Sequence, residues 1–239
     1  GGFGAIDMGV VNNGSLAAQG TGNPFGTAVG SGFRTLVTTD SLTTPGASPV
    51  RHDNSFRYTS PSMSGFTGEY YYVKKNTKAS STAFTTTFGT YDTTGISEIT
   101  LKYSNGPLNV AFANQTQDGK DTNATAPANT KGTLNTLGAN YTMGAITGYL
   151  LNQTAKDDNA TAANKLDRTT NIYGVKYVSG AHSFMVQTGN AKLKSSGQTS
   201  TATYQVEGQK TTLTGIGYDY ALSKRTTAYF RSESIDDKA

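Results

Sequence analysis

The chain has 239 residues, a formal net charge of +4, 10% aromatic residues, 35% hydrophobic residues and no Cys. The aromatic content and the small net charge argue against disorder, and the lack of Cys excludes a disulfide framework, thiolate metal sites and a Cys nucleophile. No run of ~18 apolar residues occurs, which excludes a helical membrane protein. The scattered basic residues form no cluster that would bind phosphate backbones, so nucleic acid is not an expected partner.

Residues 1–50 are predicted to contain no strand, and the first hairpin follows them. Phe56 and Tyr58 lead into a turn at 61–65, and Phe66 and further aromatic residues lead out of it. The alternation of these side chains has the period of two that is typical of a strand with one apolar face.

The clearest strand covers residues 98–103. Ile99, Leu101 and Tyr103 share one face, while charged and hydroxyl side chains share the other. A turn at 105–107 follows, and alternation resumes from Leu108 onward. The pattern predicts a hairpin with one apolar and one polar face.

The same unit recurs around turns at 143–144, 179–182 and 221–225, which gives five hairpins and about ten strands. Long polar loops are predicted between the hairpins, at about 75–95, 116–133, 153–168 and 191–209. Short turns at one end and long loops at the other are typical of an all-β, transmembrane, up-and-down antiparallel β-barrel.

A Tyr precedes each short turn on the apolar face. These residues are Tyr58, Tyr103, Tyr141, Tyr177 and Tyr220. An aromatic girdle of this kind is favoured at a membrane–water boundary, because the ring is apolar and the hydroxyl hydrogen-bonds to water. The alternative is a soluble β-sandwich, which also alternates but has no reason to place Tyr before every second turn.

A sheet in lipid must close on itself, because lipid offers no partner to an edge strand. The apolar face then contacts lipid and the polar face lines the interior, which is a water channel when the strands are numerous enough. About ten strands are few for a wide pore, and the first and last are not expected to pair. The chain is therefore interpreted as an internal part of a larger barrel.

Three segments resemble the Gram-negative general porins, especially those of β-proteobacteria. Residues 51–61 (RHDNSFRYTSP), 103–108 (YSNGPL) and 217–226 (GYDYALSKRT) are similar to strand and turn motifs of that family. The last of these is the most specific. The resemblance covers the whole chain, although the long loops match only in length and composition.

The resemblance implies a barrel of usually sixteen strands, assembled as a homotrimer in the bacterial outer membrane, with lipid and lipopolysaccharide around it. Residues 1–50 look like an inward-folded constriction loop. Residues 51–239 would then be strands six to fifteen, with short periplasmic turns and long extracellular loops. Within the loop, the expected constriction residues are Asn23, Pro24, Phe25, Gly26, Arg34 and Asp40. The segment from Asn23 to Gly26 lacks the acidic residue of the family's loop tip.

Alternation places a set of charged side chains on the polar face, where they would line the pore. These are Arg51, Asp53, Arg57, Lys102, Lys176 and Asp219. The resemblance puts Arg51 on the wall opposite the constriction loop, and a narrow aqueous channel focuses the field of such charges. The basic excess predicts anion preference, although Glu69 and Glu98 oppose it. The alternative is that Arg51 and Arg57 are solvated residues paired with Asp53.

The function expected from these features is passive diffusion of small hydrophilic solutes and ions through a porin, without a cofactor. An outer-membrane barrel enzyme is the less favoured alternative, because His52 and His182 are the only histidines and His52 is expected to face lipid. A surface-exposed β-protein that binds glycans or host molecules is a further alternative. Asp118, Asp121, Asp157 and Asp158 could bind Ca²⁺ between loops, although solvated loop acids are the more common case.

Overall fold

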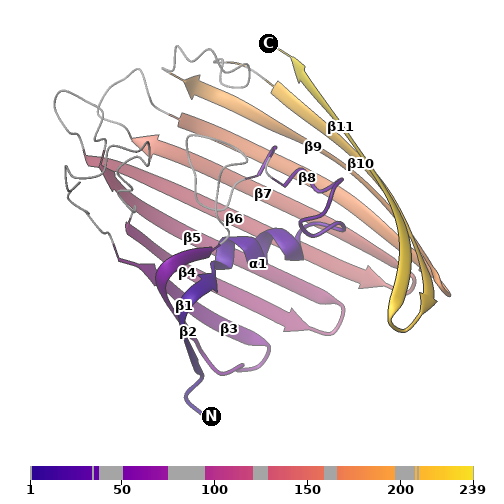
Figure 1. The fold of residues 1–239 in the computed structure, drawn as a ribbon, viewed down its shortest axis with the longest axis horizontal. Coiled ribbons are helices and arrows are strands. Elements are labelled where there is room, and N and C mark those ends of the chain that lie inside the picture. Colours follow the sequence, from indigo (N-terminus) through magenta and orange to yellow (C-terminus); the bar gives the residue numbers. More distant parts are fainter. Residues whose placement is uncertain are drawn as a thin grey trace, which may run out of the picture.

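The computed structural model describes residues 2–33, 35–37, 51–74, 95–120, 129–158, 166–196, 208 and 210–238. These residues form one antiparallel sheet of eleven strands, in which each strand pairs with its neighbours in sequence (Figure 1). The strands are β1 (Ala5–Asn12), β2 (Arg51–Thr59), β3 (Phe66–Val73), β4 (Gly95–Asn105), β5 (Leu108–Lys120), β6 (Asn129–Met143), β7 (Ile146–Asp158), β8 (Leu166–Ser179), β9 (His182–Ser196), β10 (Lys210–Ser223) and β11 (Thr226–Lys238). The predicted all-β, up-and-down antiparallel architecture is confirmed.

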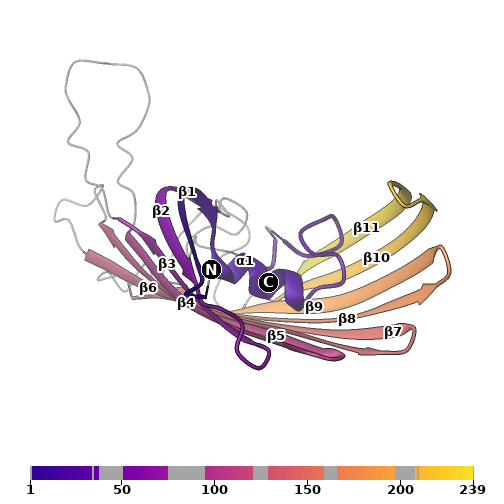
Figure 2. The same ribbon diagram turned by 90° about the horizontal axis from the view of Figure 1, so that it is seen from below.

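The sheet is strongly curved and forms an open trough (Figure 2). Strands β1 and β11 are its two edges, and within the described ranges each pairs with a single neighbour. The helix α1 (Gly14–Thr21) lies inside the trough. We call the concave side the inner face and the convex side the outer face.

The alternation of side chains across β4 follows the prediction. Ile99 and Leu101 are 63% and 51% exposed on the outer face, whereas Glu98 and Thr100 are each 1% exposed on the inner face. A sheet that exposes its apolar side chains and buries polar ones is inverted relative to a soluble sandwich. The outer face is thus suited to lipid and the inner face to polar contacts.

Tight turns join the strands at one end of the sheet, where they were predicted. Gly106, Gly144 and Gly180 have φ values of 57°, 60° and 57°. Two-residue hairpin turns need positive φ, which glycine adopts without a Cβ clash. All five girdle Tyr residues lie beside these turns, and Tyr103 packs on Phe66 with ring centroids 4.5 Å apart. That this row marks a membrane boundary stays a prediction.

The strands extend further into the polar segments than predicted. β5 continues to Lys120, β7 to Asp158 and β9 to Ser196, all within ranges that were assigned to loops. Backbone pairing continues there while the outward side chains become polar, as Thr116 and Asp118 show. In such a segment the backbone pairs with a strand on each side, but the side chains do not alternate between apolar and polar. The hydrophobic periodicity of the sequence therefore could not identify it as a strand.

The prediction that residues 1–50 contain no strand was wrong for residues 5–12, which form β1. Ile6 pairs with Tyr58 and Met8 with Phe56, and Ile6, Met8 and Val10 are exposed on the outer face. The strand forms because these three apolar residues alternate with Asp7 and Gly9. The sheet therefore has eleven strands rather than ten. The correspondence with family strands six to fifteen stays a prediction, and β1 would add one strand before them.

Candidate functional site

The inner face of the sheet carries a folded segment of the chain, which we call the inner segment: the described residues 13–33 and 35–37. It begins with α1, crosses the sheet toward β10 and β11, and returns to lie over β7 and β8 (Figures 1 and 2). The contacts that hold it decide which part of the trough remains open.

The inner segment starts at a carboxylate on β4. Glu98 accepts hydrogen bonds from the backbone N–H groups of Gly14 and Ser15, from the Ser15 hydroxyl and from Gln115 Nε2, the last at 2.8 Å. Asn13 caps the helix by accepting from Leu16 N at 3.0 Å. The free N–H groups of a helix N-terminus favour a negative group, so Glu98 fixes α1 on the wall.

Glycines on the inner face let the segment lie directly on the strands. A Cβ on Gly138 would overlap the Ala18 carbonyl, and one on Gly215 would overlap the Gly30 carbonyl. Gly174 and Gly217 likewise face Pro24 and the Phe25 ring. Asn140 donates to Thr21 O at 2.8 Å. The main chain of the segment therefore packs on the main chain of the wall.

The residues expected at the loop tip lie on the wall instead of projecting from it. Asn23 is buried, accepts from Phe25 N at 3.0 Å and donates to Ser31 O at 2.8 Å. Phe25 is buried under the Arg231 guanidinium, 5.6 Å from its ring centroid. Gly26, with φ of 61°, begins an exposed turn through Val29. The part that projects is thus 27–29.

A second carboxylate holds the far end of the segment. Glu233 on β11 accepts from Gly30 N at 2.8 Å and from Gly32 N at 3.1 Å. Gln187 on β9 donates to the Gly30 carbonyl. The turn at 30–32 is therefore held on the wall by hydrogen bonds through two N–H groups and one carbonyl.

The returning end packs through apolar side chains. Leu36 and Val37 form a buried cluster with Leu151, Ile172 and Leu213 of the wall. Thr170 donates to Leu36 O at 2.9 Å. Apolar packing and a hydrogen bond to the backbone therefore hold this end on β7, β8 and β10.

Three basic side chains of the inner face form ion pairs. Arg57 pairs with Asp7 at 2.8 Å, and Lys102 pairs with Glu69 at 2.8 Å. Asp219 pairs with Arg231 at 2.5 Å. Asp7, Glu69 and Arg231 thus neutralise three of the residues predicted to line the pore.

Two basic side chains of the inner face have no ion pair within the described ranges. Lys176 is half-buried on β8 beside the short turns. Arg168, further along β8, is 6% exposed, and its Nη2 has no hydrogen-bond partner. Arg168 was not among the predicted residues, because the polar stretch 153–168 was assigned to a loop.

A bulge in β2 changes the positions of Arg51, Asp53 and His52. Asn54 has φ of 56°, and the pairing shifts between Ser55–Gly9 and His52–Val11. The extra residue reverses the alternation. His52 therefore lies on the inner side against Tyr71, with ring centroids 6.5 Å apart, and not toward lipid as predicted. Arg51 and Asp53 are exposed and out of phase with Arg57.

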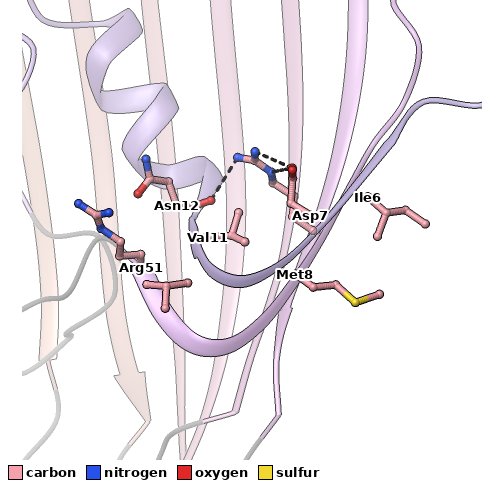
Figure 3. A pocket seen from close by; sticks show the side chains of 8 residues that line it. Ile6, Asp7, Met8, Val11, Asn12 and Arg51 are labelled. Atoms are coloured by element: carbon pink, nitrogen blue, oxygen red, sulfur yellow. Dashed lines mark hydrogen bonds and ion pairs between the residues drawn. The ribbon is translucent and has the colours of Figure 1, made fainter. Parts of the chain in front are cut away.

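Arg51 still lines a pocket at the edge of the sheet, with a volume of about 450 Å³ (Figure 3). Asp7, Asn12 and Arg57 contribute its other polar groups, and Arg57 also donates to Asn12 O at 3.3 Å. Figure 3 shows the Arg51 side chain beside Asn12, where β1 leads into α1. Arg51 and Arg57 therefore line one pocket at this edge even though the bulge breaks the alternation that had predicted a shared face.

The structure does not describe several of the predicted residues, and for two others it describes the backbone but not the side chain. Arg34, Asp40 and Asp121 are outside the described ranges, as are the side chains of Asp157 and Asp158. Among the described side chains no group of three His, Asp or Glu residues is placed to hold a metal ion. The Ca²⁺ hypothesis therefore stays a prediction. In the same residues, no helix is long and apolar enough to span a bilayer.

The chain belongs to the Gram-negative porin family, whose model matches residues 1–239. No curated protein sequence matches it. Family membership places the protein in the bacterial outer membrane and makes the sheet part of a transmembrane β-barrel.

Solved structures share the fold. The anion-selective porin of Comamonas acidovorans is 21% identical with a TM-score of 0.75, and the match covers all of this chain and 65% of that one. An OmpT variant from Vibrio cholerae that lacks loop L8 is 16% identical with a TM-score of 0.69, over 99% of this chain and 71% of that one. A porin refined at 1.8 Å resolution is 16% identical with a TM-score of 0.63, over 100% and 74%. The chain thus spans about two thirds of these relatives.

Proposed function

We propose that the protein forms a water-filled channel through which small hydrophilic solutes and ions diffuse passively, and that it assembles as a homotrimer. The observation that carries this is the inverted sheet. Its outer face is apolar, its inner face is polar, and the inner segment lies across the inner face. Outer-membrane lipid and lipopolysaccharide surround the outer face.

The inner segment narrows the channel without closing it. Because it follows one path over β4 to β11, it leaves solvent beside it rather than filling the trough. Solutes are then selected by size at the segment and by charge at the side chains that face the open side. Such transport makes and breaks no bond, so it needs no catalyst.

We propose anion preference for this channel. Lys176 and Arg168 on the inner face, and Arg51 in the edge pocket, form no ion pair among the described residues. Glu98 and Glu233 are engaged by N–H groups of the inner segment. The similarity to the anion-selective porin supports the fold of this chain. At 21% identity, it gives no support for the ion selectivity of this chain. The preference therefore depends on this chain's own charges.

Planar-bilayer recording of the full-length protein tests both proposals. Ohmic single-channel steps are expected, and a folded trimer without channels would contradict the porin function. In a KCl gradient the wild-type reversal potential should indicate anion preference, and Arg51→Ala should reduce it. Lys192→Ala, on the outer face, is the matched control. An unchanged potential in Arg51→Ala would remove Arg51 from the selectivity residues.

The two alternative functions fit the structure less well. A surface β-protein that binds glycans would not expose Ile99, Leu101 and their neighbours on the outer face, and it would extract without detergent. For an enzyme, the two histidines would have to act together. His52 is on the inner side of β2 and His182 is on the outer side at β9, seven strands away in sheet order.

A further inference from the structure

One short turn differs from the others in charge. The connections at 60–65, 106–107, 144–145 and 180–181 contain no charged residue, whereas the turn between β10 and β11 contains Lys224 and Arg225. Both side chains are exposed, and neither forms an ion pair within the described residues. Two adjacent positive charges therefore stand in one turn, whereas the other four short connections carry none.

This turn is joined to the neighbouring turn. Ala221 N donates to Ala181 O at 2.9 Å, which links the last residues of β10, just before the β10–β11 turn, to the β8–β9 turn. His182, the residue after Ala181, pairs in register with Tyr220. The imidazole therefore lies at the same end of the same two hairpins as the two positive charges.

Aromatic rings surround His182 on the outer face. Its ring centroid is 5.0 Å from that of Tyr220 and 6.0 Å from that of Tyr218. His182 Nδ1 lies 2.8 Å from the Tyr218 hydroxyl oxygen, and Phe184 packs on Tyr218 with centroids 5.1 Å apart. With Nδ1 engaged by this hydroxyl, Nε2 is the ring nitrogen that remains for an external partner.

The position of these groups indicates which partner they fit. Tyr220 belongs to the row of Tyr that borders the apolar outer face, and Lys224 and Arg225 follow it by four and five residues, on the side away from that face. Basic side chains just beyond an aromatic belt reach the level of lipid headgroups. Short turns of such barrels face the periplasm, where the leaflet consists of phospholipid.

We propose that His182, Lys224 and Arg225 bind the phosphodiester headgroup of an anionic phospholipid of the periplasmic leaflet, with Tyr218 and Tyr220 against its glycerol and upper acyl carbons. Guanidinium and ammonium groups are suited to phosphate oxygens, and the tyrosine rings match a partner that is apolar at one end and polar at the other. This site lies outside the channel and does not depend on solute transport.

The test uses the full-length trimer in detergent with equal amounts of phosphatidylglycerol and phosphatidylcholine of the same acyl chains. Native mass spectrometry measures the ratio of the two lipids retained. The K224Q/R225Q double variant should lower the preference for phosphatidylglycerol roughly thirtyfold, since each basic residue near an anionic surface contributes about fivefold. His182→Gln should lower it to a smaller extent.

The K192Q/K210Q double variant is the matched control. Lys192 and Lys210 pair in register on β9 and β10 at the opposite end of the same strands, so the same two charges are removed. Retained preference in this control, with loss in K224Q/R225Q, supports the proposal. Equal loss in both variants, or no preference in the wild type, would overturn it.

A second arm separates lipid from the cell wall, which is also anionic. Each variant is sedimented with purified peptidoglycan sacculi. Lost co-sedimentation of K224Q/R225Q, together with an unchanged lipid ratio, would assign the two charges to the cell wall and reject the lipid site. Heat-modifiable trimer bands in all variants verify folding.

Discussion

Glu233 accepts a hydrogen bond from Gly30 N at 2.8 Å and thereby joins the last strand of the sheet to a turn that precedes it by 203 residues. With Glu98 at the other end, it makes a two-point attachment of the inner segment. Each attachment is a carboxylate of the wall that accepts backbone N–H groups of the segment, and their consequences for the channel can be tested separately.

Removing the distal attachment should loosen the turn at 30–32. Glu233→Ala leaves two N–H groups without their charged acceptor, and a hydrogen bond to a charged group contributes about 1.5–3 kcal/mol. We expect increased current noise and sub-conductance states in single-channel recordings. Asp236→Asn, an exposed position on the same strand, is the control. Equal noise in both variants would show that Glu233 does not hold the segment.

Removing the proximal attachment should affect stability more strongly. Glu98 is 1% exposed and has four hydrogen-bond donors, so Glu98→Ala leaves buried donors unpaired, at a cost of about 2–4 kcal/mol. The folded protein should convert to its unfolded form at a lower temperature in heat-modifiability gels. Glu98→Gln retains one acceptor oxygen and should fall between Ala and wild type. A wild-type unfolding temperature for Glu98→Ala would contradict the role of Glu98 in holding the inner segment.

The inner glycines should tolerate no side chain. Gly138→Ala places a methyl group against the Ala18 carbonyl, and such overpacking typically costs about 1–3 kcal/mol. The expected result is a lower unfolding temperature together with a changed single-channel conductance, because the segment must move into the open space. Gly148→Ala is the control, since a Cβ at Gly148 meets nothing within 4 Å. If the two variants behave alike, the segment does not lie on Gly138.

Ion-pairing should decide how strongly each basic residue influences selectivity. Lys176→Ala removes a charge with no ion-pair partner among the described residues, so the reversal potential in a KCl gradient should shift toward cation preference. Lys102→Ala removes a charge that Glu69 already neutralises, but it also frees Glu69. The double variant Lys102→Ala/Glu69→Ala should therefore differ little from wild type. If the reversal potential shifts more in the double variant than in Lys176→Ala, the prediction that unpaired basic residues influence selectivity most would be rejected.

Much of the fold could be predicted from the sequence because one face of each strand meets lipid. Ile99, Leu101 and Tyr103 alternate with polar residues in a way that defines strand, face and neighbouring turn together. The strand ends beyond this apolar band could not be predicted. Their pairing depends on backbone hydrogen bonds to neighbouring strands, and residues such as Thr116 and Asp118 leave no alternation to detect.

The site was predictable only in part, because alternation gives a face but no partner. It placed Lys102 and Asp219 on the inner face, yet their ion pairs with Glu69 and Arg231 depend on strand register. The bulge at Asn54 is a positive-φ position without glycine, which no periodicity indicates. It reversed the expected side of His52. Glu233 and Gly30 meet only because the inner segment crosses nearly the whole sheet.

The direct contact between the inner segment and the wall glycines has a consequence for how this channel can diversify. Where main chain lies against main chain, neither surface can change alone without steric conflict. The exposed apex at 27–29 is under no such restriction, and Val29 is 60% exposed there. Substitutions at this apex can therefore change the pore diameter for solutes of different size, while the packing of the inner segment on the wall glycines stays the same.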